Sequence, residues 1–470
     1  MNKTTKEKSG NFFAVLPVIV SLAWPTVLEE VMQTAVQYID TAMVGSLGKQ
    51  ATAAVGSTGT VSWLVGSTVS AIGVGFLAYI SQAMGAGQKD KAEKASGQAV
   101  MSVIAVGILF TALTTALSGA IPVWMQVDVS IREMASRYFL ILYSPMLFRT
   151  ASIIFGTVLR SVGDTKSPMI AGIFVNVINV ILNFFLIYPT RNVSLFGNDF
   201  IIFGAGWGID GAAAASAAAY TVGGIIITVT FWKHKTISPK GQKFRPDMAI
   251  LKPCLKVAIP NMLQRFATSL GYVAFASMIN SLGETATAAH TIANTVESAF
   301  YIPGYGMQTA AATLSGNACG AVDKKRLSEL AKITITLVVV LMILSGGLLF
   351  LFAPQLMGLF SKDDEVIRLG TAVLRMVAVS EPFYGVPIVV EGIMQGAGKT
   401  VTPFIFNLLG MWCVRIVGTF ICTQLLGLGL IVAWGCMIGH NILLFILFIV
   451  HYATGRWKPE YMRTSQDRKQ

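Results

Sequence analysis

The chain has 470 residues, of which 54% are hydrophobic and only 12% charged, and its formal net charge at pH 7 is +12. Soluble domains carry roughly 25% charged residues, so this composition excludes an ordinary water-soluble domain and indicates a membrane protein. The basic excess alone would also suit a nucleic-acid-binding surface, but the placement of the charges along the chain disfavours that interpretation.

Twelve apolar runs follow one another from the N-terminus, and each is long enough to cross about 30 Å of hydrocarbon at a rise of about 1.5 Å per residue. The sequence therefore predicts an all-α membrane protein with twelve transmembrane helices. We expect these helices at residues 14–45, 52–82, 96–122, 131–158, 168–189, 208–232, 254–280, 289–315, 331–354, 366–394, 403–426 and 429–452.

Positive charge is concentrated on one side of the predicted membrane. Of the 35 Lys and Arg residues, 25 fall in the two tails, in the loops on their side or at the span ends that border those loops. Six fall in the opposite loops or in the first turns of the spans that border them (Lys49, Arg132, Arg137, Arg191, Lys362 and Arg368), and four lie deeper within spans (Arg149, Arg265, Arg375 and Arg415). By the positive-inside rule, both termini are predicted in the cytoplasm, with the protein in the inner (plasma) membrane.

The second half of the chain repeats the first at one constant offset, which equals half the chain length. Ser46-Leu47-Gly48 returns as Ser281-Leu282-Gly283, and Gly163-Asp164-Thr165 is echoed by Gly398-Lys399-Thr400. Each half holds six predicted spans, so the halves share one orientation and their pseudo-two-fold axis must run along the membrane normal. Repeats of this kind are typical of transporters that rock one half against the other.

This repeat predicts two six-helix lobes, at residues 1–232 and 253–455. A polar cytoplasmic connector at 233–252 joins them, and a cytoplasmic tail follows at 456–470. The connector is long enough to tether the two bundles without locking them together.

Asp40, in the first span, is the strongest candidate for a residue that couples transport to an ion, because ionisable groups inside a membrane are costly and usually functional. The fifth span carries Asn176, Asn179 and Asn183 on one helical face, and Asn183 lies at a depth similar to that of Asp40. One carboxylate with amide oxygens could bind Na⁺ as a metal site. Alternatively, Asp40 could take a proton when buried, or the asparagines could merely bridge neighbouring helices.

Several motifs resemble those of the multidrug and toxic compound extrusion (MATE) transporters. The segment 40–48, Asp-Thr-Ala-Met-Val-Gly-Ser-Leu-Gly, resembles the first-helix signature of that family, and the segments 159–165 and 395–400 look like its paired R/Q-G-x-G-x-T turns. The likeness covers nearly all of the chain. It implies two six-helix lobes and the cation-coupled export of organic, often cationic, compounds.

The resemblance also bears on the ion-coupling positions. It adds Ser216 on the sixth helix to Asp40, Asn179 and Asn183. Members of the DinF-like branch commonly have an aspartate where this chain has Asn183, so the choice between Na⁺ and H⁺ stays open. Members of the NorM-like branch have an acidic residue along the seventh helix, where this chain has none, so the chain is closer to the DinF-like branch.

Repeat arithmetic suggests two further features. Position 40 maps to Phe275, so we expect the ion site in the first half only. Position 30 maps to position 265, which places Glu30 and Arg265 at equal depth in related helices. The two could pair in one conformation and separate in another, or each could pair locally within its own bundle.

Two further acidic residues, Glu297 and Glu391, lie in the eighth and tenth predicted helices and could attract a cationic substrate. Glu391 could instead hold the nearby turn at 396–399. Together with Glu30 and Arg265, these residues are our candidates for substrate binding or gating.

The sequence therefore predicts a secondary active exporter of amphiphilic cationic drugs that works by alternating access. Na⁺ or H⁺ is the coupling ion, and we expect no cofactor and no nucleic-acid partner. A lipid-linked glycan flippase is the nearest rival, which extra spans and a cationic cavity would favour. An enzyme is disfavoured, because the outer loops are short and Ile393 stands where a phosphate-binding loop requires its first glycine.

Overall fold

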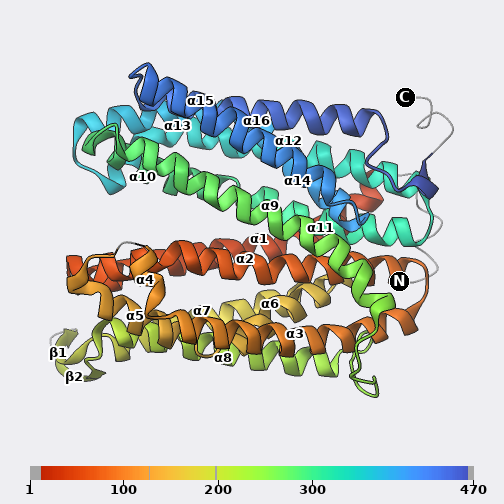
Figure 1. Ribbon diagram of the computed structural model, residues 1–470, viewed down its shortest axis with the longest axis horizontal. Helices are drawn as coiled ribbons and strands as arrows, with labels where there is room; N and C mark the ends of the chain where they lie inside the picture. Colours follow the sequence, from red (N-terminus) through yellow and green to blue (C-terminus); the bar gives the residue numbers. More distant parts are fainter. Residues whose placement is uncertain (1–11, 126, 196–197, 464–470) are drawn as a thin grey trace. The chain divides into compact units, whose positions relative to one another are not determined.

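The computed structural model describes residues 12–125, 127–195 and 198–463, and most of them are helical (Figure 1). The predicted N-terminal basic tail at 1–11 and the end of the predicted cytoplasmic tail, 464–470, lie outside the described residues.

The helices follow the predicted order, and two strands lie between α7 and α8. In chain order they are α1 (Phe12–Gly45), α2 (Lys49–Gly85), α3 (Lys89–Leu117), α4 (Ala120–Trp124), α5 (Val129–Tyr143), α6 (Met146–Ser161), α7 (Lys166–Leu186), β1 (Pro189–Leu195), β2 (Asn198–Ala205), α8 (Gly208–Lys233), α9 (Met248–Asn280), α10 (Glu284–Phe300), α11 (Ile302–Gly320), α12 (Lys324–Phe360), α13 (Asp364–Gly396), α14 (Val401–Leu408), η2 (Leu409–Ile416), α15 (Val417–Thr419), η3 (Phe420–Leu425), α16 (Leu430–Ala453) and η4 (Glu460–Met462). The run from α14 to η3 is one span, part of it wound as a π-helix.

Among the described residues, nine helical spans are long and apolar enough to cross a bilayer, and the pair α5–α6 makes a tenth. The more polar α9 and the pair α10–α11 complete the twelve predicted spans. Helices suit this setting because they satisfy every backbone hydrogen bond internally where no water is available.

Three of the predicted continuous helices are interrupted in the structure. The span predicted at 96–122 is broken at Ser118 and Gly119, between α3 and α4. The span predicted at 131–158 bends by 51° between α5 and α6. The break falls at Ser144 and Pro145, because proline has no amide hydrogen to continue the helical ladder. The span predicted at 289–315 is likewise interrupted at Tyr301, between α10 and α11.

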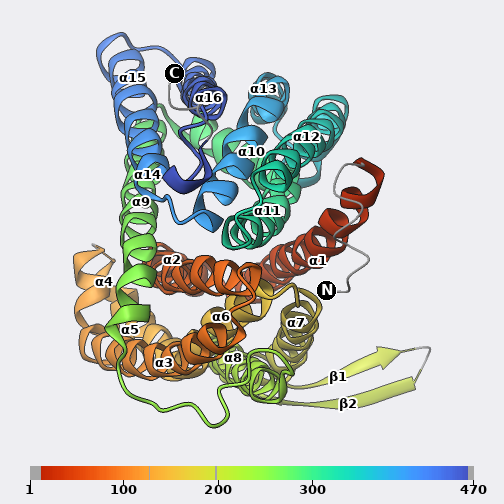
Figure 2. The ribbon, with the colours of Figure 1, turned by 90° about the vertical axis from the view of Figure 1, so that its right-hand side faces the viewer.

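A β-hairpin between α7 and α8 is absent from the prediction of an all-α chain. Strands β1 and β2 pair antiparallel, with Asn192 opposite Ile201. Figure 2 shows the hairpin extending away from the ends of the two helices that it connects. Ile201 and Phe203 on β2 are 78% and 67% exposed.

The repeat is visible in backbone conformation as well as in sequence. Gly48 and Gly283, which occupy equivalent positions in the two halves, both have a φ of +106°. Gly87 has a φ of +71°, and its counterpart Val322 has a φ of +54°. Val322 is the one residue other than glycine with positive φ in the described part of the chain. The repeat therefore imposes a glycine conformation on a β-branched side chain.

Helix capping follows the same register. The side chain of Asp128 accepts a hydrogen bond from the backbone N–H of Ser130 at the start of α5. Asp363, its equivalent in the second half, accepts from Glu365 and Val366 at the start of α13. Each aspartate satisfies backbone donors that a helix leaves unpaired in its first turn.

Contacts between residues divide the chain into two compact units. The N-unit contains Leu28–Phe76 and Asp90–Leu251, and the C-unit contains Met1–Val27, Leu77–Lys89 and Lys252–Gln470. The first part of α1 and the last part of α2 thus belong to the C-unit, whereas the predicted boundaries assign them to the first lobe. The division into lobes at 1–232 and 253–455 stays a prediction.

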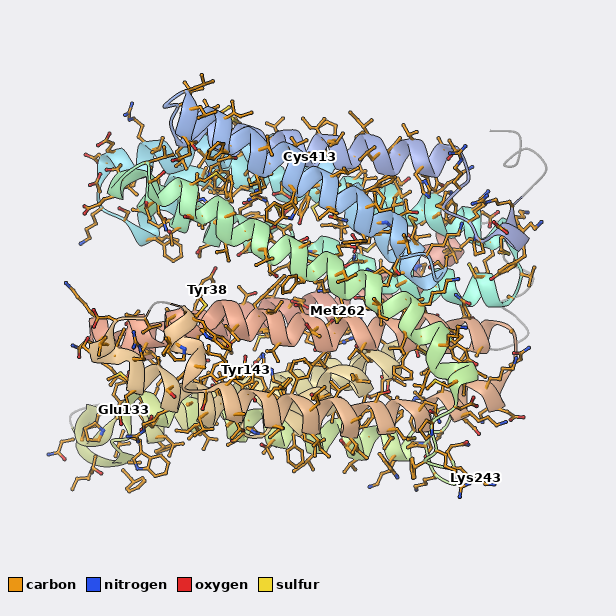
Figure 3. The ribbon with its side chains drawn as sticks, in the orientation of Figure 1. Tyr38, Glu133, Tyr143, Lys243, Met262 and Cys413 are labelled. Carbon is orange, nitrogen blue, oxygen red and sulfur yellow. The ribbon has the colours of Figure 1, made fainter. Side chains whose placement is uncertain are left out.

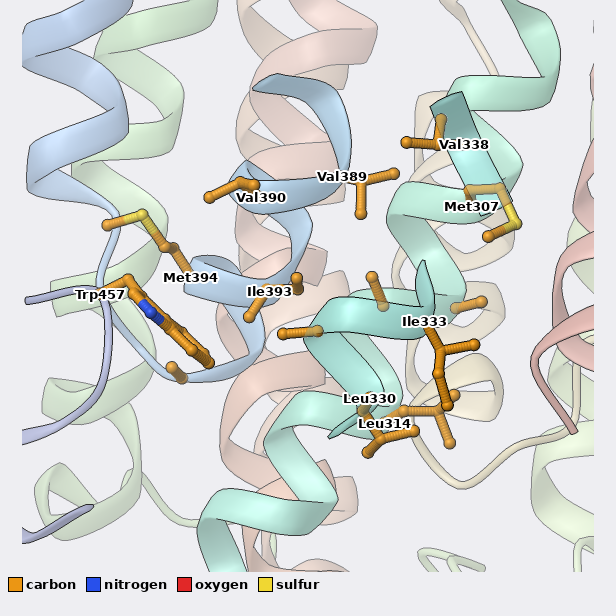
Figure 4. Close-up of a cluster of buried hydrophobic side chains, with 14 of the residues drawn as sticks. Met307, Leu314, Leu330, Ile333, Val338, Val389, Val390, Ile393, Met394 and Trp457 are labelled. Atoms are coloured by element: carbon orange, nitrogen blue, oxygen red, sulfur yellow. The ribbon is translucent and has the colours of Figure 1, made fainter. Parts of the chain in front are cut away.

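The main core of the C-unit lies where α11, α12 and α13 meet (Figure 4). Glycines allow this close packing: a Cβ at Gly392 or Gly396 would collide with backbone atoms of Gln308 or Ala312 on α11. The buried side chains labelled in Figure 4 are Met307, Leu314, Leu330, Ile333, Val338, Val389, Val390, Ile393, Met394 and Trp457.

Candidate functional site: a half-buried carboxylate between α1, α7 and α8

Within the N-unit, Asp40 on α1 meets the asparagine face of α7. Asn183 Nδ2 donates a hydrogen bond to Asp40 Oδ1 at 2.6 Å. Asn179, with its amide nitrogen turned toward the carboxylate, donates to the two Asp40 oxygens at 2.8 and 3.1 Å. Its amide oxygen then accepts from the Ser216 hydroxyl on α8 at 2.9 Å. Of the three asparagines that share one face of α7, Asn179 and Asn183 thus contact Asp40.

The cluster offers a charged oxygen acceptor surrounded by groups that can present either nitrogen or oxygen. Asn179 and Asn183 are buried, and Asn183 Oδ1 has no hydrogen-bond partner among the described residues. With the nitrogens turned inward, the amides stabilise a negatively charged Asp40. With the oxygens turned inward, the same residues would supply the hard ligands that a small cation requires.

Asn176 does not belong to this hydrogen-bonded cluster. It is partly buried on α7, but no hydrogen bond joins it to Asp40, Asn179 or Asn183 in the described part of the chain. In the same part of the chain, no three His, Cys, Asp or Glu side chains group together as metal ligands. A cation held at this site would depend on one carboxylate and the amide oxygens beside it.

Near this cluster lies an arginine among tyrosines, which the sequence analysis did not find. The guanidinium carbon of Arg149 on α6 is 4.8 Å from the ring centroid of Tyr220 and 5.4 Å from that of Tyr143 (labelled in Figure 3). Tyr138 lies within electrostatic reach of both Asp40 and Arg149. The tyrosines come from α5 and α8, so no spacing along a single helix could have revealed the group.

An ion pair lies elsewhere in the N-unit. Arg160, at the end of α6, is 2.5 Å from Glu29 on α1, and both side chains are largely buried. Their counterparts in the second half are Gln395 and Gln264, and both of these donate to Glu391 at 3.0 Å. The repeat therefore keeps a polar link at these positions but exchanges an ion pair for amides around a single carboxylate.

Glu391 and Arg265 have partners within the C-unit. Asn407 adds a third amide to Glu391 at 3.2 Å. Gln395 directly precedes the 396–399 turn, so its contact with Glu391 fits the alternative in which Glu391 holds that turn. Arg265 Nε donates to Asn261 one helical turn away at 2.9 Å. Glu30 lies partly buried on α1, and its pairing with Arg265 stays a prediction.

Phe275 stands at the position equivalent to Asp40, and it is buried against a cation. The guanidinium carbon of Arg415 lies 4.3 Å from its ring centroid. Glu297, which is 6% exposed, lies within electrostatic reach of this arginine. Glu381 is 1% exposed, and neither of its carboxylate oxygens has a hydrogen-bond partner among the described residues. The C-unit thus holds two buried acids, Glu297 and Glu381, and neither stands at the position equivalent to Asp40.

Comparison with known protein families identifies the class. The MatE family model matches the chain twice, at residues 25–185 and 260–421. The two matches begin half the chain length apart, which confirms the predicted offset between the halves. Because these matches cover more than half of the sequence, the chain belongs to the MatE family of membrane transporters.

Its curated relatives match it over almost their whole length. The chain is 26% identical over 448 residues to a "Probable multidrug resistance protein NorM" of Thermotoga maritima, covering 95% of this chain and 94% of the relative. It is also 26% identical to "Probable multidrug resistance protein YpnP" of Bacillus subtilis, covering 96% and 98%. The assignment to the DinF-like rather than the NorM-like branch stays a prediction.

Solved structures confirm the predicted two-lobe, twelve-helix fold. The chain superposes with a TM-score of 0.86 on the crystal structure of MATE in complex with MaD3S, at 22% identity and with 100% of both chains covered. An outward-facing multidrug resistance MATE family transporter of the MOP superfamily gives a TM-score of 0.83 at 21% identity, covering 97% of this chain and 98% of the other.

Proposed function

We propose that this protein is a multidrug exporter that expels amphiphilic organic cations in exchange for inward-moving Na⁺ or H⁺. Membership of the MatE family and the names of the curated relatives support drug export. We further propose that the protein lies in the inner membrane with both termini in the cytoplasm, as the distribution of Lys and Arg indicates.

The observation that carries ion coupling is the hydrogen-bonded group of Asp40, Asn179 and Asn183 with Ser216. A carboxylate removed from water must be neutralised or strongly hydrogen-bonded. Here two amide groups face Asp40, and the Asn183 oxygen is left without a partner among the described residues. A proton or a cation can occupy this site in one state and leave it in the other.

Export then follows from linked equilibria. If the cation and the drug favour different conformations, each weakens the binding of the other by the same factor. The inward gradient of the cation can therefore drive the drug outward. Two acids of the C-unit, the buried Glu297 and the partly buried Glu391, could attract cationic substrates.

Transport in proteoliposomes tests this proposal. Efflux of a fluorescent monocation such as ethidium is measured under an imposed Na⁺ gradient and, separately, under an imposed pH gradient. We expect one gradient to accelerate efflux by the native protein and neither to do so in Asp40→Asn. A matched control is Asp210→Asn, because Asp210 on α8 forms an ion pair with the exposed Arg137. Gradient-driven efflux by Asp40→Asn at the native rate would reject the assigned role.

A further inference from the structure

Two cysteines of the C-unit lie side by side on its last two spans. Cys422 is on η3 and Cys436 is on α16, and their Sγ atoms are 4.0 Å apart. Both side chains are partly buried, and both thiols are free. The other three cysteines are different, because Cys254 and Cys319 are buried and Cys413 is exposed. Two adjacent thiols can form a disulfide, which an isolated thiol cannot do within one chain.

A glycine brings the two helices close enough for a covalent link. A Cβ at Gly418 would lie 3.3 Å from Cys436 Sγ and 3.6 Å from Cys436 Cβ. Residue 418 is one helical turn before Cys422, so Cys436 packs against the helix face that carries Cys422. A disulfide joins Cβ atoms about 3.5–4.5 Å apart. Because Gly418 has no side chain, the Cys436 thiol has room to turn toward Cys422.

The same close packing continues along the two spans. A Cβ at Gly410 would lie 2.4 Å from His440 Cδ2, and a Cβ at Gly439 would lie 3.6 Å from Val414 Cγ1. Both contacts are farther from the turn between the spans than the cysteines are. The alignment of the two helices is therefore fixed over several turns, and the thiols face each other as a consequence.

Polar groups lie beside the thiols at the turn between the two spans. Cys422 is three residues before the end of η3, and Cys436 is six residues after the start of α16. Gln424 Nε2 donates to Ser281 Oγ at 2.7 Å and to Thr423 Oγ1 at 3.1 Å. With both termini in the cytoplasm, as proposed above, this turn faces the cell exterior. The exterior is where disulfides form and persist.

We propose that Cys422 and Cys436 form a dithiol that low-molecular-weight disulfides oxidise reversibly to an intramolecular disulfide. This inference rests on the proposed orientation and not on drug export. The Cys422 thiolate, nearer the turn, attacks one sulfur of the oxidant disulfide and releases one oxidant thiol. The Cys436 thiolate then attacks the Cys422 sulfur of the mixed disulfide and releases the second oxidant thiol. The two cysteine protons end on the released thiols, so the cysteines are oxidised and the oxidant is reduced.

The disulfide links the last two spans across the turn between them. Backbone contacts already close this turn, since the Cys422 carbonyl accepts a hydrogen bond from Leu428 N–H at 2.8 Å. The η3 segment is wound as a π-helix, a form that is uncommon and often found at functional sites. A bond to Cys436 holds this segment against α16 for as long as the pair is oxidised.

Peptide mass spectrometry tests the proposal. Trypsin releases residues 416–456 as one peptide, because no Lys or Arg lies between Arg415 and Arg456, and its only cysteines are Cys422 and Cys436. Purified protein in lipid nanodiscs is treated with oxidised glutathione, alkylated with N-ethylmaleimide under denaturing conditions and digested. We expect the native peptide to lose two hydrogens and take up no alkyl group. After treatment with dithiothreitol, it should take up two alkyl groups.

Cys422→Ser and Cys436→Ser are the matched variants, because each leaves one thiol in the same peptide. We expect the remaining cysteine to carry glutathione or an alkyl group, with no loss of two hydrogens. Cys413→Ser removes the exposed cysteine of the same span and should leave the native result unchanged. A native peptide that takes up two alkyl groups after the oxidant, or keeps bound glutathione, would overturn the inference. If the serine variants fail to fold, the native peptide still decides.

Spheroplasts separate this inference from the proposed orientation. Oxidised glutathione added outside reaches only the outer surface, because its charges keep it from crossing the membrane. We expect the same disulfide to form in intact spheroplasts. If the disulfide forms in nanodiscs but, in spheroplasts, only after permeabilisation, the dithiol site stands and the proposed orientation fails.

Discussion

The hydrogen bond from Asn183 to Asp40 joins α7, which carries the asparagines, to α1, which carries the acid. At 2.6 Å it is short for a nitrogen donor, as expected for a charged acceptor. Hydrogen bonds to charged groups contribute about 1.5–3 kcal/mol, so their loss is measurable in the affinity of a coupling ion. The amide therefore adjusts how readily the carboxylate accepts a proton or a cation.

Replacing Asn183 by leucine removes this amide at nearly constant volume. We expect the cation concentration that gives half-maximal drug efflux to change by at least about tenfold, because Asp40 loses a donor and any cation loses an oxygen ligand. The measurement is efflux from proteoliposomes over a series of cation concentrations. Asn176→Leu, on the same helix but outside the cluster, should leave that concentration at the native value. An unchanged Asn183→Leu protein would contradict this role.

Residue spacing placed Asn179 and Asn183 on one face of a single helix, and both contact Asp40. The same spacing also included Asn176, which has no hydrogen bond to this cluster among the described residues. It could not predict the tyrosines around Arg149, since Tyr138 and Tyr220 come from α5 and α8. It also missed the ion pair of Glu29 and Arg160, which joins α1 to α6. Contacts between helices depend on packing, which periodicity within one helix does not contain.

At the scale of helices and their connections, equivalent positions in the two halves form similar turns between spans. The predicted anchors at Gly48 and Gly283 adopt the same backbone conformation. The register also accounts for the paired aspartate caps of α5 and α13. The break at Pro145 and the hairpin after α7 have no counterpart in the described part of the other half. The repeat therefore could not predict either feature.

Val322, in the turn before α12, has a strained backbone conformation because it occupies the position where the first half has Gly87. A left-handed conformation costs a β-branched residue about 1–2 kcal/mol, and the side chain is 56% exposed, so it contributes little packing in return. We expect Val322→Gly to raise the free energy of unfolding by about 1 kcal/mol, measured by thermal unfolding in detergent. The reciprocal change Gly87→Val should lower it. A less stable Val322→Gly protein would show that the valine is held by contacts that offset the strain.

For the protein as a whole, the topology follows from composition and charge rather than from any single contact. The two copies of the family model confirm the internal repeat. Among the described residues, nine apolar helices and one bent pair are long and hydrophobic enough to cross a bilayer. Helix α9 and the pair α10–α11 do not reach the same length and hydropathy. Those two spans carry Arg265 and Glu297, so the polarity that weakens the span signal marks candidate functional positions.

The proposed orientation predicts which surfaces reagents reach in intact cells. In a cysteine-free background, we expect a cysteine at Ile201 on the hairpin to react with a membrane-impermeant maleimide from outside. A cysteine at Lys243, in the connector after α8, should react only after the cells are permeabilised. The reverse pattern would place both termini outside and contradict the positive-inside interpretation.

Competition between the coupling cation and the drug at equilibrium is the decisive measurement for the proposed coupling. Ethidium binding to purified protein in nanodiscs is titrated across series of Na⁺ concentration and pH, for the native protein and for Asp40→Asn. We predict that one cation weakens ethidium binding to the native protein by about 5–150-fold, and that Asp40→Asn binds ethidium with no such dependence. If Asp40→Asn retained the native dependence on that cation, the coupling would lie elsewhere in the protein and the role proposed for Asp40 would be wrong.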